Sequence, residues 1–107
     1  MTLVSEIYQL TARFPRHELY GLSAQMRRAS VSIPSNIAEG SRQRTTDALV
    51  HHLRHALASG SELETQLEIS RRLGYASDDE INKADDLSIR VAKMLNKLIG
   101  NLERAAR

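Results

Sequence analysis

Residues Ser32-Ile33-Pro34-Ser35-Asn36-Ile37-Ala38-Glu39-Gly40 say more about the fold of this chain than any other stretch. They place a proline in the middle of an amphipathic helical pattern. A proline inside a helix removes one backbone donor and crowds the carbonyl four residues back, at a cost of roughly 3 kcal/mol. Helices bend at such a residue. We therefore predict a kinked helix, with the kink at Pro34.

The helical pattern extends outward from this proline. Apolar residues recur every three or four positions and stay within a stripe of about 80° on a helical wheel. They are Leu22, Met26, Ala29, Ile33 and Ile37. This spacing predicts a helix over about residues 22–39, with Gly40 as its C-terminal stop.

Three further helices follow from the same period. The first covers about residues 2–11 and ends before Phe14-Pro15, because the residue before a proline is pushed out of the α region. The third begins near Thr45 or Thr46 and ends at Leu73-Gly74. The fourth begins at a capping box of Ser77 and Glu80.

The last two predicted helices each carry an apolar seam. In the third helix the seam consists of Leu49, Leu53, Ala56, Gly60, Leu63 and Leu67. In the fourth it consists of Ile81, Ala84, Leu87, Ser88, Val91, Met94, Leu95, Leu98 and Leu102.

These elements predict one all-α domain of 107 residues. Strands are disfavoured, because no β-branched run alternates with period two. Short connections make neighbouring helices antiparallel, so we expect an up-down-up-down four-helix bundle with a kinked second helix. The first helix is too short to cover its partners. Either it begins upstream of Met1, or one end of the bundle core is open.

Composition narrows the class of protein. The chain has no cysteine, which excludes disulfides and zinc thiolates. It has no signal-peptide pattern and no stretch near the ~20 apolar residues of a membrane span, so we expect a cytoplasmic protein without a membrane partner. Fifteen basic residues against thirteen acidic ones give a net charge of +2, which is not the charge of a polycation.

Several stretches together resemble a known family. They are Phe14-Pro15, Tyr20-Gly21-Leu22, Gln25-Met26-Arg27-Arg28-Ala29, Val31 to Gly40, Glu62-Leu63-Glu64-Thr65-Gln66-Leu67 and Leu73-Gly74-Tyr75, in that order. The chain resembles the four-helix-bundle proteins encoded in intervening sequences of bacterial 23S rRNA genes. It is also similar to the accessory variability-determinant proteins of diversity-generating retroelements.

The resemblance implies a homopentamer with a central channel and no enzymatic activity. It also implies a longer first helix, as though Met1 were an internal methionine. The retroelement proteins are similar to nucleic-acid-binding proteins and partner a reverse transcriptase. The function of the ribosomal-gene members is essentially unassigned.

Small and apolar residues on the outward side of the second helix are candidates for an oligomer interface. Val31 lies about 180° from Leu22, and Ala24 and Ala38 share its side. The kink at Pro34 would shape this interface or present neighbouring polar residues to a partner. The alternatives are scattered surface apolar residues and a proline that only bends the helix around the core.

Four arginines are candidates for phosphate contacts, namely Arg27, Arg28, Arg42 and Arg44. The last two flank the start of the third helix, where free amides attract anions. A ring would repeat each arginine around its axis and build a strong local field. The alternative is a solvated loop with ordinary ion pairs.

Metal chemistry finds little support. His51 and His55 are one turn apart, but the stretch around His52 lacks the Glu and the third ligand of a zincin motif, so we expect exposed or interface histidines. Glu62, Glu64 and Glu68 resemble the acids of di-iron bundles, yet no histidine lies three residues after a Glu. We expect no metal and no cofactor, and Glu64 paired with an arginine of another helix.

The sequence contains no nucleophile elbow and no phosphate-binding glycine loop. We therefore expect a non-enzymatic homo-oligomer, a pentamer by its resemblance, that binds RNA or a nucleoprotein through arginine-phosphate contacts. A first alternative is an assembly scaffold that binds a protein partner and no nucleic acid. A second is a bundle that binds a small molecule or a metal.

Overall fold

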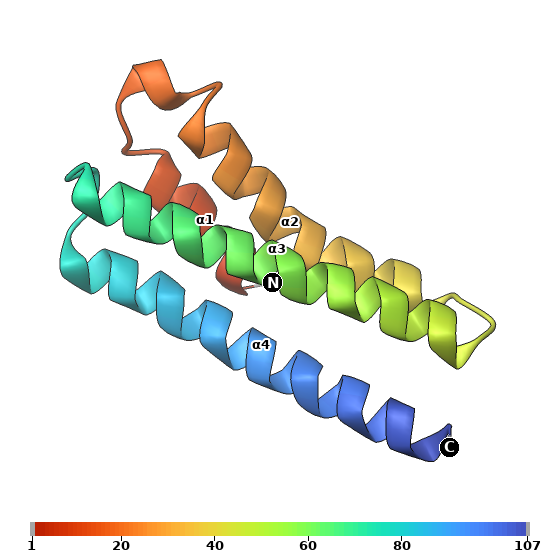
Figure 1. The fold of residues 1–107 in the computed structure, drawn as a ribbon. Helices are drawn as coiled ribbons and strands as arrows, with labels where there is room; N and C mark the ends of the chain where they lie inside the picture. Colours follow the sequence, from red (N-terminus) through yellow and green to blue (C-terminus); the bar gives the residue numbers. More distant parts are fainter. Residues whose placement is uncertain (1, 107) are drawn as a thin grey trace.

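The computed structural model describes residues 2–106, and in this range the protein is all-helical, with no strand. Four α-helices and one short 3₁₀ segment follow one another along the chain (Figure 1). They are α1 (Thr2–Thr11), η1 (Arg16–Glu18), α2 (Leu22–Ser41), α3 (Thr46–Arg72) and α4 (Asp78–Ala105). The all-α prediction is confirmed, and the predicted ends of the helices agree with these bounds to within about three residues.

The helices form an antiparallel bundle, and in cross-section they lie at the four corners of a square. Each helix contacts the next one along the chain and α1 also contacts α4, whereas the diagonal pairs α1–α3 and α2–α4 have no Cα atoms within 8 Å of each other. The result is an elongated body of 48 × 23 × 18 Å. The square is incomplete along its length, because α1 has 10 residues whereas α3 and α4 have 27 and 28.

Local signals place the helix ends. The Thr45 side chain accepts a hydrogen bond from the Ala48 amide at 3.1 Å and caps α3. At the other end of α3, Gly74 adopts a φ of 73°. The Tyr75 amide then reaches the Ser70 carbonyl at 3.0 Å, which is the Schellman arrangement. The predicted capping box starts α4, with the Ser77 hydroxyl and the Glu80 carboxylate each bonded to the other's amide.

The C-terminal end of α2 differs from the prediction. The helix runs through Pro34 and ends at Ser41, so Gly40 lies inside it and is not its stop. A Cβ atom on Gly40 would lie 3.0 Å from the Cβ of His52 and 3.0 Å from a methyl group of Leu49. The glycine therefore lets α3 approach α2 closely. The kink at Pro34 stays a prediction.

The core contains most of the predicted seams. The buried side chains come from all four helices and from Phe14 in the first connection. In α3, Val50 is buried and Leu49 is only half-buried. In α4, Met94 and Leu98 are 55% and 41% exposed, so their predicted burial is wrong. Both lie on the flank of the helix, whereas Leu95 and Ile99 turn toward the core.

The buried interior also contains serine side chains. Ser23, Ser30, Ser70 and Ser88 are buried. The Ser70 hydroxyl donates to the Gln66 carbonyl at 2.8 Å. The Ser88 hydroxyl has no partner among the described residues.

No helix of residues 2–106 is both long and apolar enough to cross a bilayer.

Candidate nucleic-acid and assembly surfaces

The turn between α2 and α3 carries two of the candidate arginines. Arg42 and Arg44 are both exposed. The Nη2 atom of Arg42 lies 2.5 Å from Oε2 of Glu39, in the last turn of α2. The Glu39 carboxylate therefore offsets part of the positive charge of Arg42. Arg44 forms no ion pair with a described residue. A cavity of about 420 Å³ lies next to Arg42 and is lined by Ser35, Asn36, Ala38 and Glu39.

Arg27 contacts side chains of α1 and stabilises the packing of α1 on α2. Its Nε donates to the Thr11 hydroxyl at 2.8 Å, and that hydroxyl donates to the Ile7 carbonyl at 2.7 Å. The guanidinium carbon of Arg27 also lies 4.9 Å from the centre of the Tyr8 ring, a cation–π distance. These contacts hold α1 against α2.

Arg28 points elsewhere. It is exposed and lines a cavity of about 130 Å³ between α2 and α3, together with Gln25, Ser32, Ser59 and Glu62. Arg28 and Arg42 are 14 residues apart on one helix track, which is about 21 Å at 1.5 Å per residue. The four arginines are therefore not one site.

The interface candidates lie on the flank of α2 away from α3. Val31 is 38% exposed and Ala38 is exposed, whereas Ala24 and Pro34 are half-buried. On a helical wheel the four residues fall within an arc of about 80°. They form a narrow strip of small and apolar side chains that Arg27 interrupts between Ala24 and Val31.

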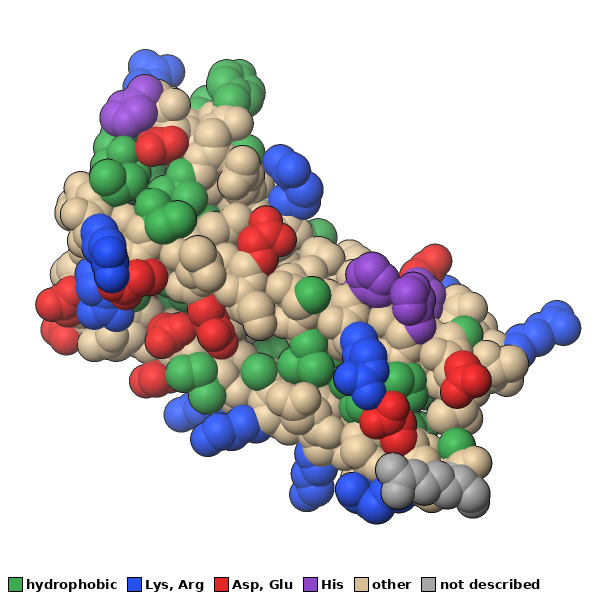
Figure 2. Space-filling view, in the orientation of Figure 1, with side chains coloured by type: hydrophobic (Ala, Val, Ile, Leu, Met, Phe, Trp, Pro, Cys, Tyr) green, Lys and Arg blue, Asp and Glu red, His purple; other side chains and the backbone are tan. Residues whose placement is uncertain are grey.

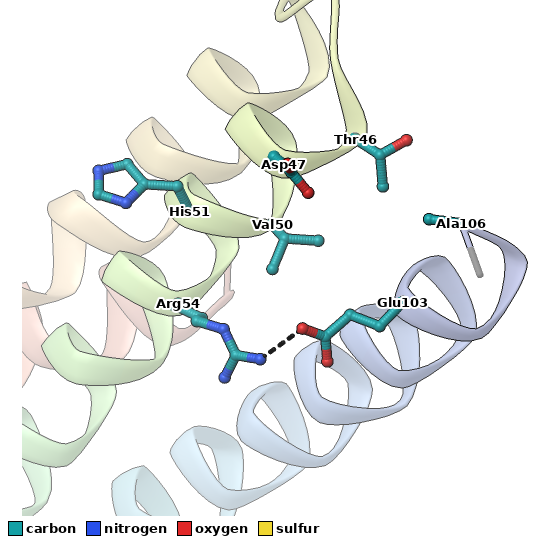
Figure 3. Close-up of a pocket in the computed structure, with 7 residues that line it drawn as sticks. All are labelled: Thr46, Asp47, Val50, His51, Arg54, Glu103 and Ala106. Carbon is teal, nitrogen blue, oxygen red and sulfur yellow. Dashed lines mark hydrogen bonds and ion pairs between the residues drawn. The ribbon is translucent and has the colours of Figure 1, made fainter.

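A cavity of about 550 Å³ lies between the start of α3 and the end of α4. Asp47 and His51 lie on the α3 side, and an ion pair at 2.8 Å between Arg54 and Glu103 joins the two helices across it (Figure 3). Both polar and apolar side chains line this cavity, and the sequence analysis did not identify it. Arg54 and Glu103 are 49 residues apart, so no local pattern pairs them.

The three histidines of α3, namely His51, His52 and His55, form two hydrogen-bonded contacts. The Nε2 atoms of His51 and His55 are 3.2 Å apart. At this distance one ring donates a hydrogen bond and the other accepts it, according to the tautomer of each ring. His52 is half-buried and its Nδ1 lies 3.3 Å from the side-chain oxygen of Asn36. Within residues 2–106, no three His, Asp or Glu side chains come close enough together to hold a metal ion.

The expected arginine partner of Glu64 is not found. Glu64 is half-buried on α3, and it forms no ion pair with any residue from 2 to 106. The ion pairs between helices use other acids, namely Glu6 with Lys83, Asp78 with Arg71 and Glu103 with Arg54. Glu80 of α4 pairs with Arg13 of the first connection. Wheel position alone put Glu64 near the seam, and wheel position does not determine which side chain of a neighbouring helix reaches it.

A contact that the sequence analysis missed joins the first connection to the turn before α4. The Tyr75 hydroxyl donates to Glu18 Oε2 at 2.8 Å, and the Leu22 amide donates to Glu18 Oε1 at 3.2 Å. The hydrogen bond from Tyr75 is the main reason that the pKa of Glu18 is lowered, and it raises the pKa of Tyr75. The one sequence signal was an acid four residues before the first residue of α2.

Known proteins give the chain a family and a fold. The model of the 23S rRNA-intervening sequence protein family matches residues 1–97. No curated protein matches. Among solved structures, a protein of unknown function from the S23 ribosomal protein family of Bacteroides thetaiotaomicron is similar, with a TM-score of 0.76 and 20% identity. The match covers 92% of this chain and 96% of that one.

That structural likeness supports the bundle fold alone. The family match spans α1 to α3 and most of α4, including the stretch around Pro34 on which the resemblance was first based. The chain belongs to the 23S rRNA-intervening sequence protein family.

Proposed function

We propose that this protein is a non-enzymatic, cytoplasmic bundle that assembles into a ring of identical subunits, a pentamer, and contacts the phosphates of RNA or a nucleoprotein. The α2–α3 turn carries the RNA proposal, because it exposes Arg42 and Arg44 side by side with the N-terminus of a 27-residue helix. Contacts to phosphates position a protein on RNA without reading its sequence. The resemblance to the retroelement accessory proteins supports the same class of partner.

Fluorescence anisotropy with a labelled single-stranded RNA tests this proposal. Arginine-phosphate contacts release counterions, so we expect affinity to fall steeply with salt. The double variant Arg42→Glu with Arg44→Glu should weaken binding, and for single strands the salt slope should decrease by about 0.7 for each lost phosphate contact.

The matched control has the same change in net charge. Arg16→Glu with Lys93→Glu reverses two exposed cations that lie on η1 and α4. We expect it to retain the wild-type affinity. Equal losses in the two double variants would show a response to overall charge and would contradict a site at the turn.

Assembly is supported by the apolar strip on α2. A ring requires two different surfaces on each subunit that meet head to tail, and the strip of Ala24, Val31, Pro34 and Ala38 is one candidate for such a surface. Light scattering should give about 60 kDa for five chains of 12.0 kDa. Val31→Glu should lower this mass, because it puts a charge into a closely packed contact. A wild-type mass of one chain at high concentration would contradict the ring.

A protein scaffold without nucleic acid is the second candidate. Arg27 is used to hold α1 and Arg42 is paired with Glu39, which leaves fewer free cations than the sequence suggested. No RNA binding at low salt, together with a pentameric mass, would favour the scaffold.

A further inference from the structure

His51 and His55 form a pair of imidazole rings on the outer surface of α3. They are four residues apart, so they lie on the same side of the helix, one turn after the other. Both are exposed, their ring centres are 4.5 Å apart, and their Nε2 atoms are 3.2 Å apart. Figure 2 shows histidine side chains side by side on this surface of the molecule. Neither ring forms a hydrogen bond or an ion pair with any other residue from 2 to 106.

The separation of these two nitrogens suits a metal ion. Zinc binds imidazole nitrogens at about 2.0–2.1 Å, and two such bonds that meet at about 90–110° place the nitrogens about 2.9–3.4 Å apart. The observed 3.2 Å falls in this range, so both nitrogens can bind one ion without a change in the backbone of α3. The ring that donates the hydrogen bond carries its proton on Nε2. To bind the ion it must carry that proton on Nδ1, a change of tautomer that leaves the ring neutral.

The other two histidines are not paired in this way. His52 is half-buried, and its Nδ1 lies 3.3 Å from the side-chain oxygen of Asn36. The Nε2 atom of His17 lies 3.2 Å from the hydroxyl oxygen of Tyr75. Each of these rings meets an oxygen of a different residue type, so neither forms a chelate with a second imidazole.

The charges around the pair favour a cation. Asp47 lies one turn before His51, and both line the cavity between α3 and α4 (Figure 3). In the same cavity the charges of Arg54 and Glu103 offset each other in an ion pair at 2.8 Å. The Asp47 carboxylate therefore leaves the neighbourhood of the histidines negative. Within residues 2–106 no third His, Asp or Glu side chain completes a metal site, so water would take the remaining positions on an ion.

We propose that His51 and His55 bind one divalent transition-metal ion, of the class of Zn²⁺ and Cu²⁺, through their Nε2 atoms. Imidazole nitrogens suit these ions, whereas Mg²⁺ and Ca²⁺ select oxygen ligands. The sequence spacing predicts exposed histidines without a metal, because two ligands one turn apart are a weak signal. The distance between the two nitrogens changes this interpretation. The site is independent of the arginines of the α2–α3 turn and of the apolar strip on α2.

Isothermal titration calorimetry on the full chain without a histidine tag tests the proposal, with Zn²⁺ and Cu²⁺ as the probes. We expect one ion per chain and tighter binding of Cu²⁺ than of Zn²⁺. His51→Gln and His55→Gln should each weaken Zn²⁺ binding at least about tenfold, because each leaves a single imidazole. An excess of Mg²⁺ should not compete.

A variant that moves one histidine separates chelation from binding to any surface imidazole. His55→Gln with Asn101→His keeps four histidines and places one at an exposed position of α4. We expect it to bind Zn²⁺ as weakly as His55→Gln alone, whereas His17→Gln should bind as the wild type does. Wild-type affinity in the moved-histidine variant would overturn the proposal. So would a wild-type protein that binds neither ion more tightly than His55→Gln does.

Thermal unfolding gives a second measurement. An ion that binds only the folded state raises the thermal midpoint, so Zn²⁺ should raise the midpoint of the wild type more than that of His55→Gln. A rise of equal size in both proteins would place the ion elsewhere and contradict the site. Half an ion per chain together with a doubled mass would place the ion between two copies, and this would also contradict a site within one chain.

Discussion

Neighbouring arginines in this protein have different roles because their surroundings differ. Arg27 and Arg28 are adjacent in sequence, yet Arg27 bonds to Thr11 over the Tyr8 ring and Arg28 lies in solvent. Residue type alone made both of them candidates for phosphate contacts. The contact with α1 separates them, and that contact requires the tertiary fold.

Substituting each of the two arginines by lysine should separate their roles. Arg27→Lys loses the planar fork that bonds Thr11 and stacks on Tyr8, and we expect it to lower the free energy of unfolding by about 1–2 kcal/mol. Arg28→Lys should change it by less than about 0.5 kcal/mol. Urea unfolding followed by circular dichroism measures both. Equal effects would mean that Arg27 does not hold α1 in place.

Acid should weaken the contact between Glu18 and Tyr75. The lowered pKa of Glu18 means that the folded state favours its carboxylate. This stabilisation is present above the unfolded-state value, near 4.5, and is lost as the pH falls through the folded-state value. The pKa of Tyr75 is raised from its ordinary value of 10.0. The same contact is therefore also lost when the pH rises through the folded-state pKa of Tyr75, which lies above 10.0.

Urea midpoints measured between pH 3 and pH 7 test the acid limb. Glu18→Gln and Tyr75→Phe should each make the midpoint less dependent on pH below about 4.5. Tyr75→Phe keeps the ring, whose centre lies 5.3 Å from that of Phe14, and removes only the hydroxyl. If both variants keep the full wild-type dependence, the contact does not contribute to it.

At the scale of the elements, α2 and α3 form the most extensive helix pair, and small and polar residues line their contact. The Ser59 hydroxyl donates to the Ser32 hydroxyl at 2.8 Å, one turn from the contact between Asn36 and His52. Gly40 then lets the helices converge toward their turn.

Two glycine-to-alanine substitutions should have opposite effects. Gly40→Ala gains helix propensity but forces a methyl group to 3.0 Å from His52 Cβ, and overpacking costs about 1–3 kcal/mol. We expect a net loss of stability. Gly60→Ala places its methyl group 3.8 Å from Ser88 Oγ, an ordinary contact, and should gain about 0.5–1 kcal/mol. Thermal midpoints compare the two. A stabilising Gly40→Ala would mean that α2 and α3 can separate there at little cost.

The whole molecule is a bundle of four helices along only part of its length. Beyond Thr2, the described bundle consists of α2, α3 and α4, and no Cα atom of α2 lies within 8 Å of one in α4. The core residues of that part, among them Leu53, Ala56 and Ile99, are buried by three helices. Fewer packed neighbours mean that local opening there costs less free energy.

Hydrogen exchange should reveal this difference along α4. We expect amides of residues 92–98 to exchange about tenfold or more faster than those of residues 82–88, which lie beside α1. Mass spectrometry of peptides, at a concentration where light scattering gives the mass of one chain, measures both segments. Equal protection would contradict a weaker end of the bundle.

The sequence by itself determined the class of fold, the number of helices and most of their ends. Helical periodicity, the caps at Thr45 and Ser77 and the left-handed Gly74 are local, so residues a few positions apart carry the signal. Local spacing also brought Arg42 and Arg44 together on one turn.

Only the tertiary structure decided which face of each helix is covered. Met94 and Leu98 fit the apolar period of α4, and they are exposed because α1 ends before it reaches them. Arg27 is not available to a phosphate, because it contacts Thr11 and Tyr8 of the neighbouring segment. Tyr75 is hydrogen-bonded to Glu18, which is 57 positions away in the sequence. Burial and pairing depend on which distant segment packs alongside. No local pattern contains that information.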